Sequence, residues 1–358
     1  MTKPNKDSSK EKDQDYLYMD FDPNTIEHLG ISMYARLPPV IAELIANSYD
    51  ADAEVVTIEL SDKDPENKSI TISDDGSGMN FNEINNKFLK IGRNRRKIEG
   101  KDITDGGRKV IGKKGIGKLS VFGVAEEVSI TTIKEGIKNK FSMSLGDIKN
   151  GGQPYKPIQE IKDEPCQEDS GTKIELIKLR RKSLFEPEEI AKDLANRFLI
   201  FDEGFKTKLI YNEDEGNIID INNEYRFKDL EEEFKWTFPN EGVKFEYDKK
   251  EEIQGELYAS KKPVNSNMKG IYLISRGKLV NKPEFYGIKE TDYAHEYLTG
   301  WLKVDFIDDY EDELISTNRE SLNWEDERTE PLKEYLKKII SFVIRSWRNQ
   351  RKRNQRKN

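Results

Sequence analysis

The chain has 358 residues, of which 36% are charged and 35% hydrophobic, and its formal net charge is −8. This length suits two domains, each with a core of its own. A single cysteine cannot form an internal disulfide, and two histidines cannot supply an ordinary zinc cluster, so disulfide-stabilised and zinc-dependent functions are excluded. The chain contains no run of about eighteen apolar residues and begins with a charged segment, which predicts a cytoplasmic protein without a membrane span or secretory signal.

The N-terminal residues divide into two segments of different character. Residues 1–15 are rich in charge and almost free of apolar side chains, so they are predicted to be flexible. In residues 16–22 (YLYMDFD) aromatic and acidic side chains alternate. This pattern fits a short strand or an arm that docks elsewhere.

Hydrophobic spacing predicts the elements of a first domain over residues 16–202 and a second over 203–330. Helices are expected at residues 38–49, 119–125 and 187–198, and strands at 54–60, 69–76, 128–133, 141–145 and 172–179. The domain boundary is expected near residues 201–206. Strand-like segments follow at 270–280 and 301–308, and residues 331–358 are predicted to form an amphipathic helix of about residues 331–347 with a basic tail.

The first helix carries polar side chains that point to chemistry. Glu43 and Asn47 are four residues apart and therefore share a face, and Asp50 follows them. A carboxylate can polarise a water molecule, and an amide oxygen is a suitable magnesium ligand. The alternative is a solvated polar stripe, although both side chains stand among apolar neighbours, where an unpaired carboxylate is costly.

The second predicted strand ends in the pattern Asp74-x-Gly76-x-Gly78. The carboxylate of Asp74 could accept a hydrogen bond from an exocyclic amine, and the glycines leave room for a flat base. The alternative is a simple strand-ending turn, for which Asp-Gly is common.

A glycine-rich turn, Gly112-x-x-Gly115-x-Gly117, precedes the second predicted helix. Its backbone N–H groups could approach phosphate oxygens, and the start of the following helix adds a favourable dipole. Positive charge is added by Lys113, Lys114 and Lys118. Any tight turn could produce the same glycine pattern.

In the order ELIANSYDADA, SDDGSGM and GKKGIGKLS, the three motifs resemble the boxes of the GHKL ATPases over about residues 16–179. This family contains type II topoisomerase ATPase subunits, mismatch-repair ATPases, ninety-kilodalton heat-shock chaperones, MORC proteins and histidine kinases. The resemblance is strongest to MORC-like and heat-shock-type prokaryotic ATPases. It implies an α+β fold: a Bergerat-type ATP-binding α/β sandwich, a smaller transducer domain of ribosomal-protein type and a C-terminal helix.

The resemblance also implies roles for individual residues, with ATP and Mg²⁺ as cofactors. Glu43 matches the general base, Asn47 the magnesium ligand and Asp74 the carboxylate that recognises adenine. A mobile lid over the phosphates would span residues 88–110. The remaining nucleotide-binding positions implied are Asp50, Gly76, Gly78, Met79, Gly92, Lys113, Lys114, Gly115, Ile116, Gly117, Lys118 and Thr172.

Transducer domains of this family supply a basic residue to the terminal phosphate. The candidates are Arg319 in ISTNRESLNW, which is preferred, and Lys278 in ISRGKLV. A surface salt bridge is the alternative for each.

The leading hypothesis for function is an ATPase in which ATP drives closure of a homodimer, serving a DNA-linked or antiviral defence process. The C-terminal tail from Arg345 onward carries only positive charges, so it could contact DNA or a nucleoprotein, or be a solvated helix end. A histidine kinase and a nucleotide-binding scaffold without turnover are the alternative functions. Kinases of this group generally lack a glutamate at the position of Glu43.

Overall fold

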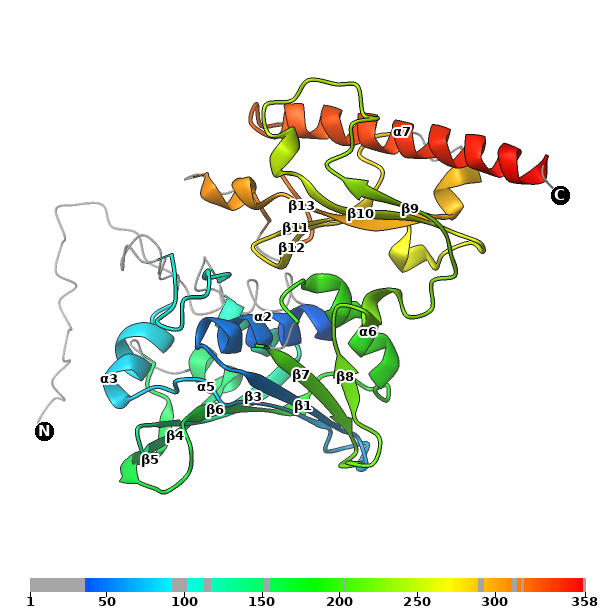
Figure 1. Ribbon diagram of the computed structural model, residues 1–358. Helices are drawn as coiled ribbons and strands as arrows, with labels where there is room; N and C mark the ends of the chain where they lie inside the picture. Colours follow the sequence, from blue (N-terminus) through cyan, green and yellow to red (C-terminus); the bar gives the residue numbers. More distant parts are fainter. Residues whose placement is uncertain are drawn as a thin grey trace, which may run out of the picture.

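In the computed structural model the described residues are 36–91, 102–112, 117–150, 155–201, 204–288, 293–310, 314–316 and 319–356, without the side chain of Lys118. They form two units, one above the other in Figure 1. Residues 1–15 and the predicted arm at 16–22 lie outside this range, and so do residues 92–101 of the predicted lid.

The first unit is built on an eight-stranded sheet with the order β5-β4-β3-β6-β2-β1-β7-β8. Its strands are β1 (Val55–Ser61), β2 (Ser69–Asp74), β3 (Ala125–Lys134), β4 (Ile137–Ser144), β5 (Ile158–Pro165), β6 (Gly171–Leu179), β7 (Lys206–Tyr211) and β8 (Ile219–Ile221). Neighbouring strands pair antiparallel except β1 and β7, which are parallel. The mixed α+β class expected from the sequence is therefore confirmed.

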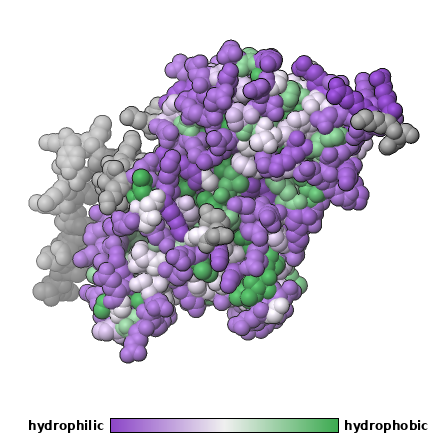
Figure 2. All heavy atoms as spheres, viewed as in Figure 1, coloured by the Kyte–Doolittle hydropathy of each residue, from purple (hydrophilic) through white to green (hydrophobic). Residues whose placement is uncertain are grey.

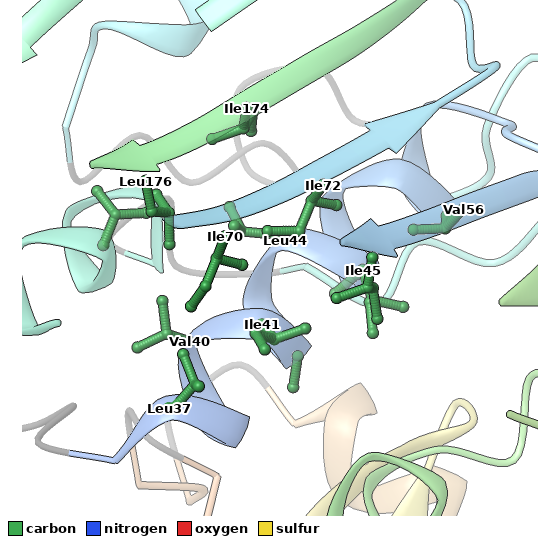
Figure 3. Close-up of a cluster of buried hydrophobic side chains, with 14 of the residues drawn as sticks. Leu37, Val40, Ile41, Leu44, Ile45, Val56, Ile70, Ile72, Ile174 and Leu176 are labelled. Carbon is green, nitrogen blue, oxygen red and sulfur yellow. The ribbon is translucent and has the colours of Figure 1, made fainter. Parts of the chain in front are cut away.

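Two helices, α2 (Leu37–Asp50) and α6 (Pro187–Arg197), cover the face of this sheet that is directed toward the second unit (Figure 1). Each has a proline in its first turn, where the missing N–H costs no hydrogen bond. The apolar face of α2 packs on the sheet in Figure 3, with these residues labelled: Leu37, Val40, Ile41, Leu44, Ile45, Val56, Ile70, Ile72, Ile174 and Leu176. Burial of such a side chain contributes roughly 1.5–3 kcal/mol, so this contact fixes the position of α2.

Shorter elements complete the first unit. They are α3 (Phe81–Glu83), the π-helix η2 (Ile84–Phe88), the 3₁₀ helix η3 (Gly117–Gly123) and α5 (Leu145–Asn150). The helix predicted at residues 119–125 is corrected here, because the chain forms the 3₁₀ helix η3 and already enters β3 at Ala125. Glycines at both ends of this segment disfavour a regular α-helix.

The domain boundary predicted between residues 202 and 203 is too early. Strand β7 pairs with β1 from Lys206 to Tyr211, and β8 pairs with β7. Leu209 and Ile221 are buried in the core of the first unit. The first unit therefore continues to at least Ile221.

The second unit is a five-stranded sheet with the order β12-β11-β13-β10-β9. Its strands are β9 (Glu232–Phe238), β10 (Gln254–Ser260), β11 (Gly270–Ser275), β12 (Lys278–Glu284) and β13 (Leu298–Lys303). Short 3₁₀ helices η4 (Tyr225–Phe227), η5 (Lys250–Glu252), η6 (Ser266–Met268), η7 (Tyr293–Glu296) and η8 (Asp305–Asp309) lie in the connections. The segment predicted as a strand at 301–308 is thus divided between β13 and η8.

The helix α7 (Glu330–Gln355) covers the outer face of the second sheet (Figure 1). It packs through an apolar stripe that ends at Trp347, and it continues beyond the predicted end at residue 347 into the basic tail. Together the two units are consistent with an ATPase domain followed by a transducer-like domain.

The surface in Figure 2 is mainly hydrophilic, with hydrophobic residues in smaller groups, as the composition leads one to expect. Within the described ranges no helix is long and apolar enough to cross a membrane.

Candidate functional site

Glu43 lies at a point where three parts of the chain meet. Its carboxylate oxygen Oε1 accepts a hydrogen bond of 2.9 Å from Lys278 Nζ, which comes from β12 of the second unit. Its other oxygen lies against Gly117, where an added β-carbon would be only 2.5 Å from Oε2. Glycine at this position therefore lets the backbone after the glycine-rich turn approach the carboxylate.

Asn47 is one helical turn beyond Glu43 and is exposed. Among the described residues no group of His, Cys, Asp or Glu side chains is placed to hold a metal ion. A magnesium ion at this site would therefore depend on the amide oxygen of Asn47 together with ligands from a nucleotide, which is compatible with the way that this ion retains water and phosphate ligands.

Carboxylates at the C-terminal end of α2 hold the segment that leads into the glycine-rich turn. Asp50 accepts hydrogen bonds from the backbone N–H groups of Ile111 and Gly112, at 2.9 and 2.8 Å. Asp52 accepts one from the N–H of Gly106 at 2.8 Å, and another from the Thr104 hydroxyl. Asp50 thus fixes the backbone at Ile111 and Gly112, where the glycine-rich motif begins.

Asp74, at the end of β2, has a well-organised carboxylate. Oδ2 accepts a hydrogen bond of 2.7 Å from the Ser48 hydroxyl, and Oδ1 accepts from the N–H groups of Gly76 and Thr172 at 3.0 and 3.3 Å. Burial raises the pKa of Asp74, while these hydrogen bonds oppose the rise. A carboxylate can accept about four hydrogen bonds, so one acceptor position is left for a ligand amine.

The residues expected to line a base pocket lie around Asp74. Gly78 has a φ of +61°, and an added β-carbon would lie 1.9 Å from the carbonyl oxygen of Ile133. The Met79 N–H donates to Thr132 Oγ1 at 2.9 Å, and this hydroxyl is 3.2 Å from that of Thr172. The structure therefore brings Gly78, Met79 and Thr172 together beside Asp74.

Lys278 and Arg319, the two basic candidates of the second unit, are both buried. Arg319 pairs with Asp308 at 3.0 Å and donates to the carbonyl oxygens of Leu279 and Ile111, at 2.9 and 3.3 Å. A surface salt bridge is therefore the wrong description of either residue. Lys278 contacts Glu43 directly, whereas Arg319 bonds the backbone that precedes Gly112.

Burial lowers the pKa of Lys278, and the negative charges of Glu43 and Asp50 oppose this effect. A cation in such surroundings is held near the site by its carboxylate partners.

Several predicted site residues lie outside the described residues, namely Gly92, Lys113, Lys114, Gly115 and Ile116, together with the side chain of Lys118. Of the predicted lid, residues 88–91 and 102–110 are described. Their contacts include an ion pair of 2.7 Å between Asp102 and Arg276 of the second unit.

Ser48 and Thr132 were not selected from the sequence. Ser48 occupies a helix face otherwise filled by apolar side chains, and this is a weak signal for a hydroxyl with a buried partner. Thr132 lies in β3, and threonine is common in strands generally. A single sequence therefore gives no indication of its hydrogen bond to Met79.

The family described as "Histidine kinase-, DNA gyrase B-, and HSP90-like ATPase" matches residues 35–172. This range contains Glu43, Asn47, Asp74 and Thr172 with the geometry given above. The chain belongs to the GHKL ATPase superfamily. Membership implies that the first unit binds ATP.

Curated relatives extend the similarity. "Putative type II restriction enzyme HgiDII" from Herpetosiphon aurantiacus is 30% identical over 93% of this chain and 57% of its own length. "Chaperone protein HtpG" from Sulfurovum is 29% identical over 37% of this chain and 24% of its own length. The HtpG of Natranaerobius thermophilus is 32% identical over 36% of this chain and 23% of its own length. The chain thus spans little more than half the length of the Herpetosiphon relative, and its match covers about a quarter of the length of each of these two chaperones.

Proposed function

We propose that this GHKL protein hydrolyses ATP at the point where α2, the glycine-rich turn and β12 meet. The observation that carries the proposal is the environment of Glu43. One carboxylate oxygen contacts Gly117 and the other contacts Lys278. A candidate phosphate-binding backbone and a candidate phosphate-binding cation therefore both lie against the carboxylate of the candidate base.

Glu43 is assigned the role of general base, which accepts a proton from the attacking water. Asp74 accepts a hydrogen bond from the adenine amine, and Gly78, Met79 and Thr172 surround the base. Asp50 keeps Gly112 in place, so that the glycine-rich turn can offer N–H groups to the phosphates. A magnesium ion held through Asn47 would neutralise charge on the phosphates.

Lys278 is the cation that we assign to the terminal phosphate. Its ammonium group is bonded to Glu43. A terminal phosphate carries more negative charge than a carboxylate and would compete for this ammonium group. Lys278 would then stabilise the phosphoryl group, and Glu43 would be left free to accept a proton from water.

The proposed role is nucleotide-gated homodimerisation in a DNA-linked or defence process. Support comes from the printed name of the Herpetosiphon relative, a putative restriction enzyme, and from the exposed basic end of α7. The likeness to HtpG supports the heat-shock-type mechanism of closure. The MORC-like assignment stays part of this proposal.

Phosphotransfer to histidine is less well supported. His295 is buried in the second unit and packs edge to face against Phe285, with the ring centroids 4.3 Å apart. A phosphoacceptor must be open to the donor, so His295 is poorly placed for that role. His28 lies outside the described residues.

Release of phosphate by the purified chain with Mg²⁺ and ATP tests the proposed activity directly. We expect turnover that saturates with ATP and stops when the ion is chelated. Tight ATP binding without phosphate release would favour the scaffold, and transfer of labelled phosphate to the protein would favour the kinase.

We expect Asp74→Asn to weaken ATP binding by about 1.5–3 kcal/mol, which is roughly 10- to 150-fold in Kd. The asparagine oxygen can still accept from Gly76 and Thr172, but its NH₂ group then takes the place of Oδ2 and faces the adenine amine as a second donor. Calorimetric titration with ATP measures the change.

Asp75→Asn is the matched control for this substitution. Asp75 is exposed and uses a single oxygen, Oδ1, to accept from the N–H groups of Glu54 and Val55, both at 2.8 Å. An asparagine can keep both bonds. Equal losses of ATP affinity in the two variants, or none in Asp74→Asn, would remove Asp74 from the base pocket.

The basic end of α7 is predicted to bind DNA through its exposed side chains. Deleting the whole tail would also remove the buried Trp347 and the ion pair of Arg351 with Glu233. Exchanging Lys352, Arg353 and Arg356 for glutamine avoids this damage. We expect weaker DNA binding and a smaller dependence of affinity on salt, because each lost phosphate contact lowers the slope by about 0.9.

A triple exchange of exposed lysines elsewhere, Lys244, Lys261 and Lys262 to glutamine, controls for total charge. Fluorescence anisotropy with a DNA duplex at several salt concentrations compares the proteins, and phosphate release without DNA should be unchanged in both. If the α7 variant binds DNA like the wild type, the tail is a solvated helix end.

A further inference from the structure

A cavity of about 770 Å³ lies between the two units. The first unit contributes the start of α2, the end of β6 with the residues that follow it, and α6, and the second unit contributes η6, β11 and β12. Its lining contains none of Glu43, Asn47 and Asp74. The cavity is therefore separate from the candidate nucleotide site.

Many charged side chains line this cavity, and several are already paired. Arg197 pairs with Asp193 at 2.5 Å, and Lys192 pairs with Asp229 at 2.7 Å. Asp193 also pairs with Arg36 at 3.5 Å, and Lys192 also pairs with Glu189 at 3.6 Å, so three cations and three carboxylates of the lining balance one another. These pairs do not account for all of the cations.

Three arginines of the lining, Arg180, Arg181 and Arg226, have no carboxylate partner within the part of the chain that the structure describes. Arg181 donates to the carbonyl oxygens of Ser183 and Leu184, at 3.2 Å and 2.8 Å. Arg180 is exposed. Glu186 is one further carboxylate of the lining, so these three guanidinium groups still give the cavity a local excess of positive charge in a protein whose net charge is −8.

Arg226 is the most informative of the three because it is buried, with 3% of its surface exposed. Its guanidinium donates to the carbonyl oxygen of Ala195 at 2.6 and 3.0 Å and to that of Phe198. Burial lowers its pKa to about 10, which still leaves it charged at neutral pH. A buried cation bonded to neutral carbonyls is costly, and a nearby anion would offset that cost.

Asn196 adds a neutral polar group to the same wall. Its Oδ1 atom is buried and has no hydrogen-bond partner among the described residues. Buried polar atoms are generally bonded, so an unbonded acceptor that lines a cavity indicates a ligand donor such as a hydroxyl group. Tyr225 and Tyr272 provide aromatic surface in the same lining.

We propose that this cavity binds a phosphate-bearing ligand, with Arg180, Arg181 and Arg226 facing the phosphate groups and Asn196 accepting a hydrogen bond from a ligand hydroxyl. Guanidinium groups match phosphate oxygens in charge and in planar, two-point geometry. The volume falls within the usual range of small-ligand sites. The ligand is either a nucleic-acid strand or a small phosphorylated molecule, since both present this chemistry.

The cavity and the candidate nucleotide site share the strand β12, so a ligand in the cavity is structurally connected to the nucleotide site. Leu279 and Lys282 of the lining belong to β12, which begins with Lys278. A ligand that bridges the two units here would therefore restrain the strand that carries the partner of Glu43.

The test uses the full chain with a non-hydrolysable ATP analogue at saturation, so that the nucleotide site is filled. One arm titrates a fluorescein-labelled thymidine oligonucleotide, and the other titrates inorganic pyrophosphate. We expect Arg180→Glu to weaken binding by roughly 10- to 100-fold. Oligonucleotide binding that Arg180→Glu weakens, without binding of pyrophosphate, identifies a nucleic-acid strand as the ligand of the cavity and distinguishes it from the basic end of α7. Pyrophosphate binding that Arg180→Glu weakens identifies a small phosphorylated molecule.

Lys182→Glu is the matched control, because it makes the same charge change two residues away on a side chain that does not line the cavity. Affinity for ATP is measured in parallel and should be equal in all three proteins, which separates this site from the proposed ATPase. The proposal is overturned if neither probe binds the wild type, if Arg180→Glu binds like the wild type, or if the two variants lose affinity equally.

Discussion

Replacing Glu43 by glutamine is expected to lower the rate of ATP hydrolysis by roughly 10²–10⁴-fold, the usual contribution of a general base. Glutamine has the length of glutamate, and its amide oxygen can still accept the hydrogen bond from Lys278. It cannot take a proton from water. Because Asn47, Asp50 and Asp74 are unchanged, ATP and Mg²⁺ should still bind.

Phosphate release and ATP titration on the same preparation decide this prediction. Glu59→Gln, an exposed position on β1, is the matched control and should hydrolyse ATP like the wild type. Wild-type turnover in Glu43→Gln would exclude Glu43 as the base. Loss of both binding and turnover would instead assign it to nucleotide binding.

The same variant tests nucleotide-gated dimerisation. If hydrolysis opens the dimer, Glu43→Gln with ATP should accumulate as a dimer, while the wild type with ADP should be largely monomeric. Light scattering with and without ATP measures the mass. A monomer with ATP fully bound would contradict the gating proposal and leave the assignment of the base intact.

Local sequence patterns predicted the elements that support the site. A proline start and apolar residues at helical spacing predicted α2, and alternation predicted β1 and β2. The same reasoning missed β5, which is an edge strand with mostly charged, exposed side chains and so resembles a loop. It also ended the first unit too early, because the pairing of β7 with β1 joins residues about 150 positions apart and depends on tertiary contacts.

The sequence predicted those candidate site residues for which the side-chain chemistry and the local spacing indicate the same role. Glu43 and Asn47 are one turn apart on α2, and Asp74 ends a strand, so their positions follow from local geometry. The contact between Glu43 and Lys278 spans the two units and could not be read from spacing. The sequence favoured Arg319 over Lys278, whereas in the structure it is Lys278 that donates a hydrogen bond to the carboxylate of Glu43.

Lys278→Met is predicted to lower the rate of ATP hydrolysis by roughly 10²–10³-fold, comparable to the loss of one preorganised group that stabilises a developing negative charge. Methionine has a similar length, but it offers no donor to a terminal phosphate. Affinity for ADP, which lacks that phosphate, should change much less than the hydrolysis rate. Lys303→Met, at a half-exposed position on β13, is the matched control.

The pH dependence of hydrolysis gives this prediction a second, independent readout. Burial lowers the pKa of Lys278 below the ordinary lysine value of 10.5. The ammonium form exists below the lowered pKa, so wild-type activity should fall at an alkaline pH where an exposed lysine would still be charged. In Lys278→Met this alkaline fall should disappear, because the residual activity no longer depends on that proton.

Stability must be measured separately, because Lys278→Met leaves Glu43 without its partner, and removing one member of a buried pair is costly. The double variant Glu43→Gln/Lys278→Met removes both charges and should recover thermal stability relative to Lys278→Met alone. Its hydrolysis should stay near that of Glu43→Gln, since the two side chains act on the same phosphoryl transfer. Fully additive losses in rate would show that Lys278 and Glu43 act independently and would contradict the proposed exchange of the ammonium group between carboxylate and phosphate.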